Sequence, residues 1–230
     1  MTKISTQLGA VRARIRAACQ AAGRPPEAVT LLAVSKTFGA DAVQAAFDAG
    51  QTAFGENYIQ EAVAKITVLR QLPLVWHCIG PVQSNKTRLV AEHFDWVHTV
   101  DRLKIAQRLS EQRPAGLPPL QVCLQVNVDG GPTKSGVAPA AALALAQAVA
   151  GLPRLRLRGL MCIPEPAPDF AAACQVFKRA SALLDDLRAQ GLKLDTLSMG
   201  MSADLEAAIA SGSTLVRVGA AIFGARHSPA

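Results

Sequence analysis

The sequence contains eight short apolar runs that alternate with segments in which apolar residues recur every three or four positions. The runs lie at about 31–35, 53–57, 75–80, 96–101, 121–128, 156–163, 196–200 and 215–219. The first begins as a continuously apolar stretch, Leu31–Val34, which is typical of a strand covered on both faces, as in a parallel sheet. Eight such strands alternating with helices predict a (β/α)8 barrel, and an open doubly wound sheet is the alternative architecture.

The segments between the runs carry the spacing of amphipathic helices. Residues 59–69 and 176–187 show it, and the segment from Pro139 to Gly151 starts with proline and stops at glycine, as helices commonly do. One more helix is expected before the first strand, with a docking face made of Ile4, Leu8, Val11, Ile15 and Cys19. A chain of 230 residues, half of them hydrophobic, is long enough for one barrel, so we expect a single domain over residues 1–230.

Composition excludes several classes of protein. The net charge is +7, but the basic residues are scattered, which does not favour a nucleic-acid partner. The five cysteines form no CxxC pair and the four histidines no metal-ligand spacing, so we expect buried cysteines, a reducing compartment and no metal site. No segment has the length of an apolar membrane span and no signal peptide is visible, so a cytoplasmic protein without a membrane partner is expected.

Lys36 stands where the first strand is expected to end. In a barrel, residues at the carboxyl ends of the strands face the mouth that holds the active site. An apolar barrel beneath the lysine disfavours its ammonium form, which raises the neutral fraction that can attack an aldehyde. The alternative is an ordinary lysine that extends its charge into solvent.

Two late segments predict a site for an anion. Residues 198–212 have the pattern of strand, turn and helix, with Ser202 as the N-cap. The start of a helix offers unpaired N–H groups that attract an anion. Acidic residues in the first turn of this helix oppose that attraction. Gly219 and Ala220 follow the eighth strand, and barrels often bind phosphate with the loops after strands seven and eight. The alternative is ordinary capping and packing of small residues. Together with Lys36, these segments indicate a ligand that carries an aldehyde and a phosphate, such as pyridoxal 5′-phosphate.

Seven blocks that run in order through almost the whole chain point to a known family. They are LLAVSKTF, FGENYIQEA, WHCIGPVQSNKTR, VHTVDR, LQVNVDGGPTKSG, RGLMCIP and LSMGMSADLEAAIASGSTLVRVGAAIFGAR. In these blocks the chain resembles the pyridoxal phosphate homeostasis protein family, which is related to the N-terminal barrel domain of alanine racemases. It departs from the family at Pro81 and Val82, where His and Leu are expected, and in GGPTKSG before its lysine.

The resemblance implies a fold-type III barrel for pyridoxal phosphate without the C-terminal β-domain. It also implies a set of cofactor-binding residues: Lys36 as the internal aldimine, Asn57 beside the ring, Ser202 with the backbone of Gly219 and Ala220 at the phosphate, and Arg217 near the pyridine nitrogen. A guanidinium stays charged, so Arg217 would keep that nitrogen unprotonated and weaken the electron-sink chemistry of the cofactor. The alternative for Arg217 is an ion pair with a carboxylate such as Glu206.

Two functions use this site. The first is storage, buffering and delivery of pyridoxal phosphate, with apo-enzymes as partners and no steady turnover. The second is an amino-acid racemase, which needs an acid/base group on each face of the substrate. In the racemases that the barrel resembles, one of these groups is a tyrosine from a separate β-domain across a dimer. Here we expect no such domain, a monomer, and a packing or hydrogen-bonding role for Tyr58, the only tyrosine. The expectation is therefore a carrier rather than an enzyme.

A lysine-dependent aldolase without cofactor is a third hypothesis, but it leaves the late blocks unexplained, and a nucleic-acid binder has the least support. Two other lysines are expected near the mouth. Lys134 is a candidate transient acceptor for the cofactor or an electrostatic aid, and the alternative is an ordinary surface lysine. The same interpretations apply to Lys86.

Overall fold

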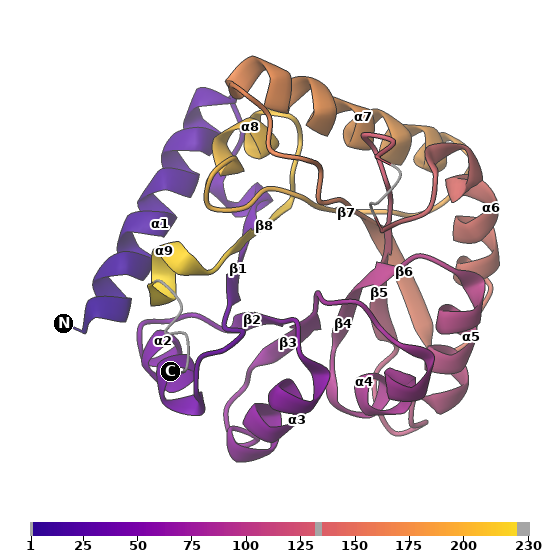
Figure 1. Ribbon diagram of the computed structural model, residues 1–230, viewed down its shortest axis with the longest axis horizontal. Coiled ribbons are helices and arrows are strands. Elements are labelled where there is room, and N and C mark those ends of the chain that lie inside the picture. Colours follow the sequence, from indigo (N-terminus) through magenta and orange to yellow (C-terminus); the bar gives the residue numbers. More distant parts are fainter. Residues whose placement is uncertain (1, 132–134, 225–230) are drawn as a thin grey trace.

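Eight parallel strands close into a barrel, and helices surround it (Figure 1). The computed structural model describes residues 2–131 and 135–224. The strands are β1 (Thr30–Val34), β2 (Ala53–Glu56), β3 (Val75–Cys78), β4 (Trp96–Val100), β5 (Leu120–Gln125), β6 (Leu155–Met161), β7 (Thr196–Ser198) and β8 (Leu215–Val218). Each pairs with the next and β8 pairs with β1, which confirms the barrel and rules out the open sheet. Every strand ends before its predicted boundary, so the polar residues at those boundaries lie in rim loops.

The helices form the outer ring. They are α1 (Lys3–Ala21), α2 (Ala40–Asp48), α3 (Ile59–Val68), α4 (Thr87–His93), α5 (Leu103–Gln112), α6 (Pro139–Ala150), α7 (Phe170–Ala189), α8 (Leu205–Ala210) and α9 (Ala220–Phe223), with short 3-10 turns at Pro26–Ala28 and Ser84–Lys86. The added helix α1 packs against α2, α8 and α9, and its predicted docking face is buried at Leu8, Val11, Ile15 and Cys19. Apolar spacing alone therefore predicted which face of α1 is buried.

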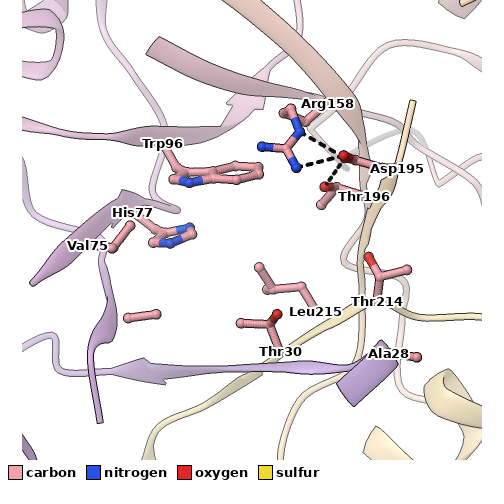
Figure 2. A pocket seen from close by; sticks show the side chains of 11 residues that line it. Ala28, Thr30, Val75, His77, Trp96, Arg158, Asp195, Thr196, Thr214 and Leu215 are labelled. Carbon is pink, nitrogen blue, oxygen red and sulfur yellow. Dashed lines mark hydrogen bonds and ion pairs between the residues drawn. The ribbon is translucent and has the colours of Figure 1, made fainter. Parts of the chain in front are cut away.

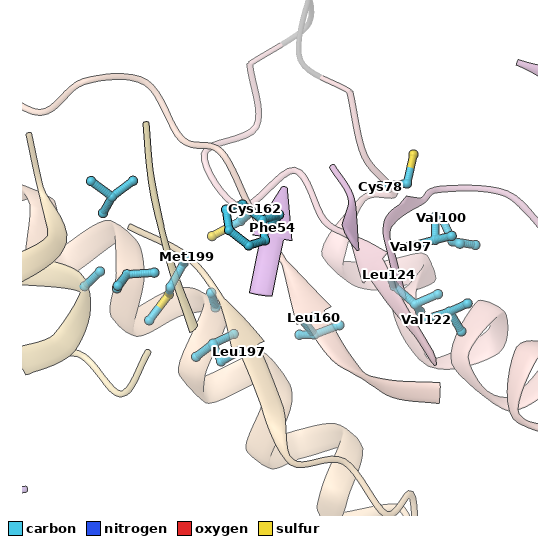
Figure 3. Packing of buried hydrophobic residues seen from close by; sticks show 14 of the residues in the cluster. Phe54, Cys78, Val97, Val100, Val122, Leu124, Leu160, Cys162, Leu197 and Met199 are labelled. Atoms are coloured by element: carbon cyan, nitrogen blue, oxygen red, sulfur yellow. The ribbon is translucent and has the colours of Figure 1, made fainter. Parts of the chain in front are cut away.

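The main hydrophobic core lies between the outward faces of the strands and the helices. Figure 3 shows part of it, with Val97, Val122 and Leu124 from neighbouring strands. Cys78 and Cys162 belong to this layer, and burial raises the pKa of both thiols to about 12. These thiols stay protonated, which confirms that they act as small buried hydrophobes.

A second, separate apolar cluster fills one side of the barrel interior. It consists of Leu32, Val34, Ala53, Ile79 and Leu215, and we call it the apolar half. Gly55 makes room for it, because a Cβ atom at this position would lie 3.0 Å from Leu32 Cδ2 and 3.1 Å from Ile79 Cδ1. Val34 comes two residues before Lys36, so the apolar half lies under the loop that carries this lysine.

Candidate functional site

Residues predicted to bind the cofactor gather at the carboxyl ends of four strands that are neighbours in the barrel. Lys36 follows β1 and Asn57 follows β2, and the register pairs Val34 with Gly55 two residues earlier on each strand. Gly219 follows β8 and packs against β1, since a Cβ atom on it would lie 3.1 Å from the Val34 carbonyl oxygen. The turn after β7 is held beside β8 by a hydrogen bond from the Arg217 backbone N–H to the Gly200 carbonyl.

A buried ionic network fixes the backbone beneath Lys36. The Ser35 hydroxyl donates to Glu56 Oε1 at 2.6 Å, and Lys65 Nζ donates to the Ser35 carbonyl at 2.8 Å and to Glu56 Oε1 at 2.6 Å. Glu56 is 0% exposed and Lys65 5% exposed. Burial raises the pKa of Glu56, while the Lys65 ammonium opposes the shift. Sequence reasoning missed Lys65, which reaches the end of β1 from helix α3.

The residue after Lys36 is held in a disfavoured backbone conformation. Thr37 has φ of 68°, in the left-handed region that β-branched residues avoid. Its N–H donates to Glu61 Oε1 at 2.8 Å, and Glu61 also pairs with Lys65 at 2.7 Å. Strain of this kind persists only where the surroundings hold it in place. Lys36 itself is partly buried, so it differs from a lysine that extends freely into solvent.

Asn57 offers an acceptor that the described residues leave unused. Its Oδ1 atom is buried and has no hydrogen-bond partner, and buried polar atoms in native proteins are rarely left so. Asn57 lines a cavity of about 630 Å³ together with Tyr58 and Lys86. Tyr58 is 53% exposed, so it is not a core packing residue. The rim therefore presents a cavity and a buried unpaired acceptor at the ends of β2 and β3.

The expectation that Ser202 caps a helix is wrong. Helix α8 begins at Leu205 with Asp204 as the N-cap, and the Asp204 side chain accepts from the Met201 N–H at 2.6 Å. The Asp204 side chain makes no hydrogen bond to the N–H groups of α8, so the helix starts where its first buried apolar residue, Leu205, follows Asp204. The Ser202 carbonyl accepts from Arg14 Nη2 at 3.1 Å, which ties the turn after β7 to helix α1.

Arg217 is a buried cation surrounded by neutral acceptors. It is 3% exposed, and its Nη1 donates to the carbonyl and the hydroxyl of Ser198, both at 2.8 Å, while its Nη2 donates to the Cys162 carbonyl at 3.0 Å. Glu206 pairs with Arg14 at 2.8 Å, so the ion pair considered for Arg217 is wrong. Burial lowers the pKa of Arg217, but a guanidinium keeps its charge in proteins.

Behind Arg217 a chain of polar side chains crosses the barrel interior. The hydroxyl of Ser198 lies 2.8 Å from His98 Nδ1, and His98 Nε2 lies 2.8 Å from His77 Nδ1. Strands β4 and β7 are not neighbours, so the contact between His98 and Ser198 spans the interior. We call His77, His98, Ser198 and Arg217 the polar column. Sequence reasoning considered the histidines only as metal ligands and missed this arrangement, which the inward positions of His77 and His98 on adjacent strands could have suggested.

Both histidines of the polar column are neutral. Burial lowers the pKa of His77 to about 3, and it lowers the pKa of His98 well below the ordinary value. His77 stacks on Trp96, with ring centroids 5.2 Å apart and an angle of 11° between the planes. The column therefore places one positive charge, on Arg217, at the end that approaches the rim.

At the opposite end of the barrel a cavity of about 420 Å³ opens among the first residues of the strands (Figure 2). His77 and Trp96 line it together with the ion pair of Arg158 and Asp195, whose two contacts are 2.8 and 2.7 Å. The Arg158 guanidinium lies over the Trp96 ring at 4.7 Å. In barrels this end serves stability rather than catalysis, and the polar groups of Arg158 and Asp195 are already paired.

Other expectations concern absences or residues that the structure does not describe. In residues 2–131 and 135–224, no three His, Cys, Asp or Glu side chains are grouped so that they could hold a metal ion. Over the same residues, none of the helices has the length and apolar character needed to cross a membrane. Lys134, the candidate transient acceptor, lies outside the described residues.

Comparisons with known proteins agree with this architecture. The family described as alanine racemase, N-terminal domain, matches residues 6–227. The pyridoxal phosphate homeostasis protein of Pseudomonas aeruginosa is 64% identical over 98% of this chain and 97% of its own length, and that of Escherichia coli K12 is 55% identical over 98% of each. The structure of PipY from Synechococcus elongatus with PLP bound is 38% identical, with a TM-score of 0.84 over 96% of this chain and 100% of PipY.

More distant structures share the fold alone. An alanine racemase of Clostridium difficile is 17% identical, with a TM-score of 0.72 over 99% of this chain and 57% of the racemase. By contrast, the homeostasis proteins match at high identity along nearly their full length. The chain therefore belongs to the pyridoxal phosphate homeostasis protein family, which shares its barrel with the N-terminal domain of alanine racemase.

Proposed function

We propose that this protein binds pyridoxal 5′-phosphate at the rim of the barrel through a reversible imine bond on Lys36 and holds it as a carrier. The observation that carries the proposal is the position of Lys36, two residues after β1, between Asn57 after β2 and Gly219 after β8. Relatives named for pyridoxal phosphate homeostasis and the PLP-bound PipY structure support the choice of ligand.

The residues at the rim match the groups of this ligand. Pyridoxal phosphate supplies an aldehyde, a phosphate and an electron-withdrawing ring. Lys36 supplies the amine, and the apolar half lies beneath its loop. The buried Oδ1 of Asn57 supplies an unused acceptor for a donor group.

The phosphate and the ring nitrogen take the remaining predicted residues. In this proposal Ser202 and the backbone of Gly219 and Ala220 hold the phosphate, with Ser202 acting from a turn and not as a helix cap. Arg217 would lie near the pyridine nitrogen, and its permanent positive charge would keep that nitrogen unprotonated and weaken carbanion chemistry.

The carrier role is favoured over racemisation by the state of Tyr58. A racemase needs a second acid/base group opposite the lysine. Tyr58 is the only tyrosine, and it is 53% exposed, whereas proton transfer to a carbanion is favoured in a site that excludes water. An open rim suits loading and release of the cofactor, and apo-enzymes that depend on it are the proposed recipients.

The covalent position is tested by trapping. Protein loaded with pyridoxal phosphate is reduced with borohydride and digested, and mass spectrometry is expected to place the adduct on Lys36. The Lys36→Ala variant should lose both the adduct and the visible absorption of the imine. The matched control is Lys86→Ala, which removes a lysine that lines the rim cavity and should retain both signals. An adduct that persists in Lys36→Ala, or that maps elsewhere in the native protein, contradicts the proposal.

Exchange of the hydrogen on the amino-acid Cα distinguishes a carrier from a racemase. In heavy water the loaded protein should incorporate no deuterium into alanine or other amino acids at an enzyme-like rate, yet it should restore activity to an apo-enzyme that lacks the cofactor. Rapid deuterium incorporation would establish the racemase, and failure to activate any apo-enzyme would count against delivery.

A further inference from the structure

We propose that Ser198, His98 and His77 form a hydrogen-bond chain of fixed direction that positions the Arg217 guanidinium for the cofactor. The part that concerns the cofactor rests on the proposed function, whereas the direction of the chain is a property of the protein alone. The three residues come from β7, β4 and β3, and Arg217 comes from β8, so the chain joins opposite walls of the barrel.

The direction follows from what each group can donate. Arg217 has only donors, so the Ser198 hydroxyl oxygen must accept its bond. Among the residues that the structure describes, the other group within hydrogen-bond distance of this hydroxyl is His98 Nδ1, so its single hydrogen is satisfied there by donation to that nitrogen. His98 then carries its hydrogen on Nε2 and donates it to His77 Nδ1. Consequently His77 also carries its hydrogen on Nε2.

The opposite direction leaves a hydrogen without an acceptor. If His98 Nδ1 were the donor, the Ser198 oxygen would accept from both neighbours and its own hydrogen would face no acceptor among the described residues. Ser198 is 0% exposed, so water does not compensate, and a buried unsatisfied donor is destabilising. Burial of both imidazoles also favours neutral rings, which the chain requires because His98 must accept one bond and donate another and His77 must accept one.

The chain explains how a buried arginine is held without a carboxylate. Donation from Ser198 to His98 polarises the hydroxyl and makes its oxygen a better acceptor for Arg217. The Ser198 carbonyl and the Cys162 carbonyl complete the support. Because every one of these acceptors is neutral, the charge of Arg217 is not cancelled. Counting the described residues only, the Nε hydrogen and one Nη2 hydrogen have no protein acceptor, so they are left for a ligand.

The direction is tested on the protein without cofactor by ¹⁵N NMR of the imidazole nitrogens. The expected result is a neutral His98 and a neutral His77, each protonated on Nε2, with the same pattern at neutral and mildly acidic pH. Protonation of His98 on Nδ1, or a charged imidazole on either residue, would overturn the proposed direction. This measurement does not depend on whether the protein binds pyridoxal phosphate.

The positioning of the Arg217 guanidinium is tested by comparing the Ser198→Ala variant with the Ser198→Thr variant. The alanine variant removes the link between Arg217 and His98, so we expect roughly tenfold weaker binding of pyridoxal phosphate and a shifted absorption spectrum. It should also abolish the single tautomer of His98 in the NMR spectrum. The threonine variant keeps the hydroxyl and should restore all three signals.

A matched control removes a different buried hydroxyl. Ser213 is 0% exposed and donates to the Met199 carbonyl at 2.7 Å, and the hydrogen bonds of its hydroxyl go to backbone carbonyls of Leu197, Met199 and Leu215 rather than to the chain. The Ser213→Ala variant should retain the tautomers, the cofactor affinity and the spectrum.

The two proposals fail in distinguishable ways. Native affinity and spectrum in a folded Ser198→Ala protein would refute positioning while leaving the carrier function intact. Absence of cofactor binding in the native protein would refute the carrier function, and the NMR result would still decide the direction. If Ser198→Ala does not fold, His98→Asn provides the same comparison.

Discussion

The barrel interior is divided between two regions of opposite chemistry, the apolar half and the polar column. The apolar half, beneath Lys36, resembles the usual barrel interior of layered aliphatic side chains. The polar column places two histidines, a serine and an arginine where such layers would otherwise continue. The first region contributes stability and a dry surface under the lysine amine. The second is tolerated because its members satisfy one another, and it delivers a positive charge to the rim.

The largest effect is expected from a cavity in the apolar half. Leu32 is 0% exposed, so Leu32→Ala should lower the free energy of unfolding by about 2–5 kcal/mol. Urea denaturation measures the loss, which should be the same at neutral and acidic pH because no titratable group is removed. The control Val68→Ala, at a position that is 70% exposed, should change stability by about 0.5 kcal/mol or less. A loss of that small size in Leu32→Ala would show that the apolar half does not support the barrel.

The polar column should make stability depend on pH. An unfolded histidine binds a proton below about pH 6.5, whereas folded His77 does so only near pH 3, so acid stabilises the unfolded state. Between pH 7 and pH 5 this residue should lower the free energy of unfolding by about 2 kcal/mol. His77→Phe should therefore lose about 2 kcal/mol less than the native protein over this interval, as measured by urea denaturation at both pH values.

The comparison with Leu32→Ala isolates the acid-dependent loss of stability that is due to His77. That variant keeps both histidines, so it should show the same acid-dependent loss as the native protein. An acid-dependent loss in His77→Phe equal to the native one would contradict a neutral, buried His77.

The smallest change in stability is expected for a substitution at Gly219, where the barrel interior meets the rim. A Cβ atom at Gly219 would lie 3.1 Å from the Val34 carbonyl oxygen, so Gly219→Ala requires a small shift and should cost about 1 kcal/mol of stability. Cofactor titration should show a several-fold weaker affinity, because the shift displaces the backbone proposed to hold the phosphate. Gly116→Ala is the control, since nothing lies within 4 Å of its added atom, and unchanged cofactor affinity in Gly219→Ala would argue against this backbone as the phosphate site.

Local patterns predicted the scaffold and part of the site. The eight apolar runs located all eight strands, and the spacing of Leu8, Val11 and Ile15 located the docking face of α1. Because a strand that is buried on both faces is recognisable from its own residues, Lys36 could be placed at the end of β1. Ser202 was misplaced as a cap, since two acceptable cap residues stand two positions apart and only the packing of α8 selects Asp204.

By itself the sequence determined the barrel, the order of its strands and the family, because these depend on periodicity and on motifs that are continuous along the chain. Tertiary structure alone decided that Lys65 supports Ser35 and Glu56 under the lysine loop, and that His98 meets Ser198 across one hundred residues. Such contacts form only when the barrel closes. A buried polar side chain takes its partner from whichever wall then lies opposite, and no local pattern records that wall.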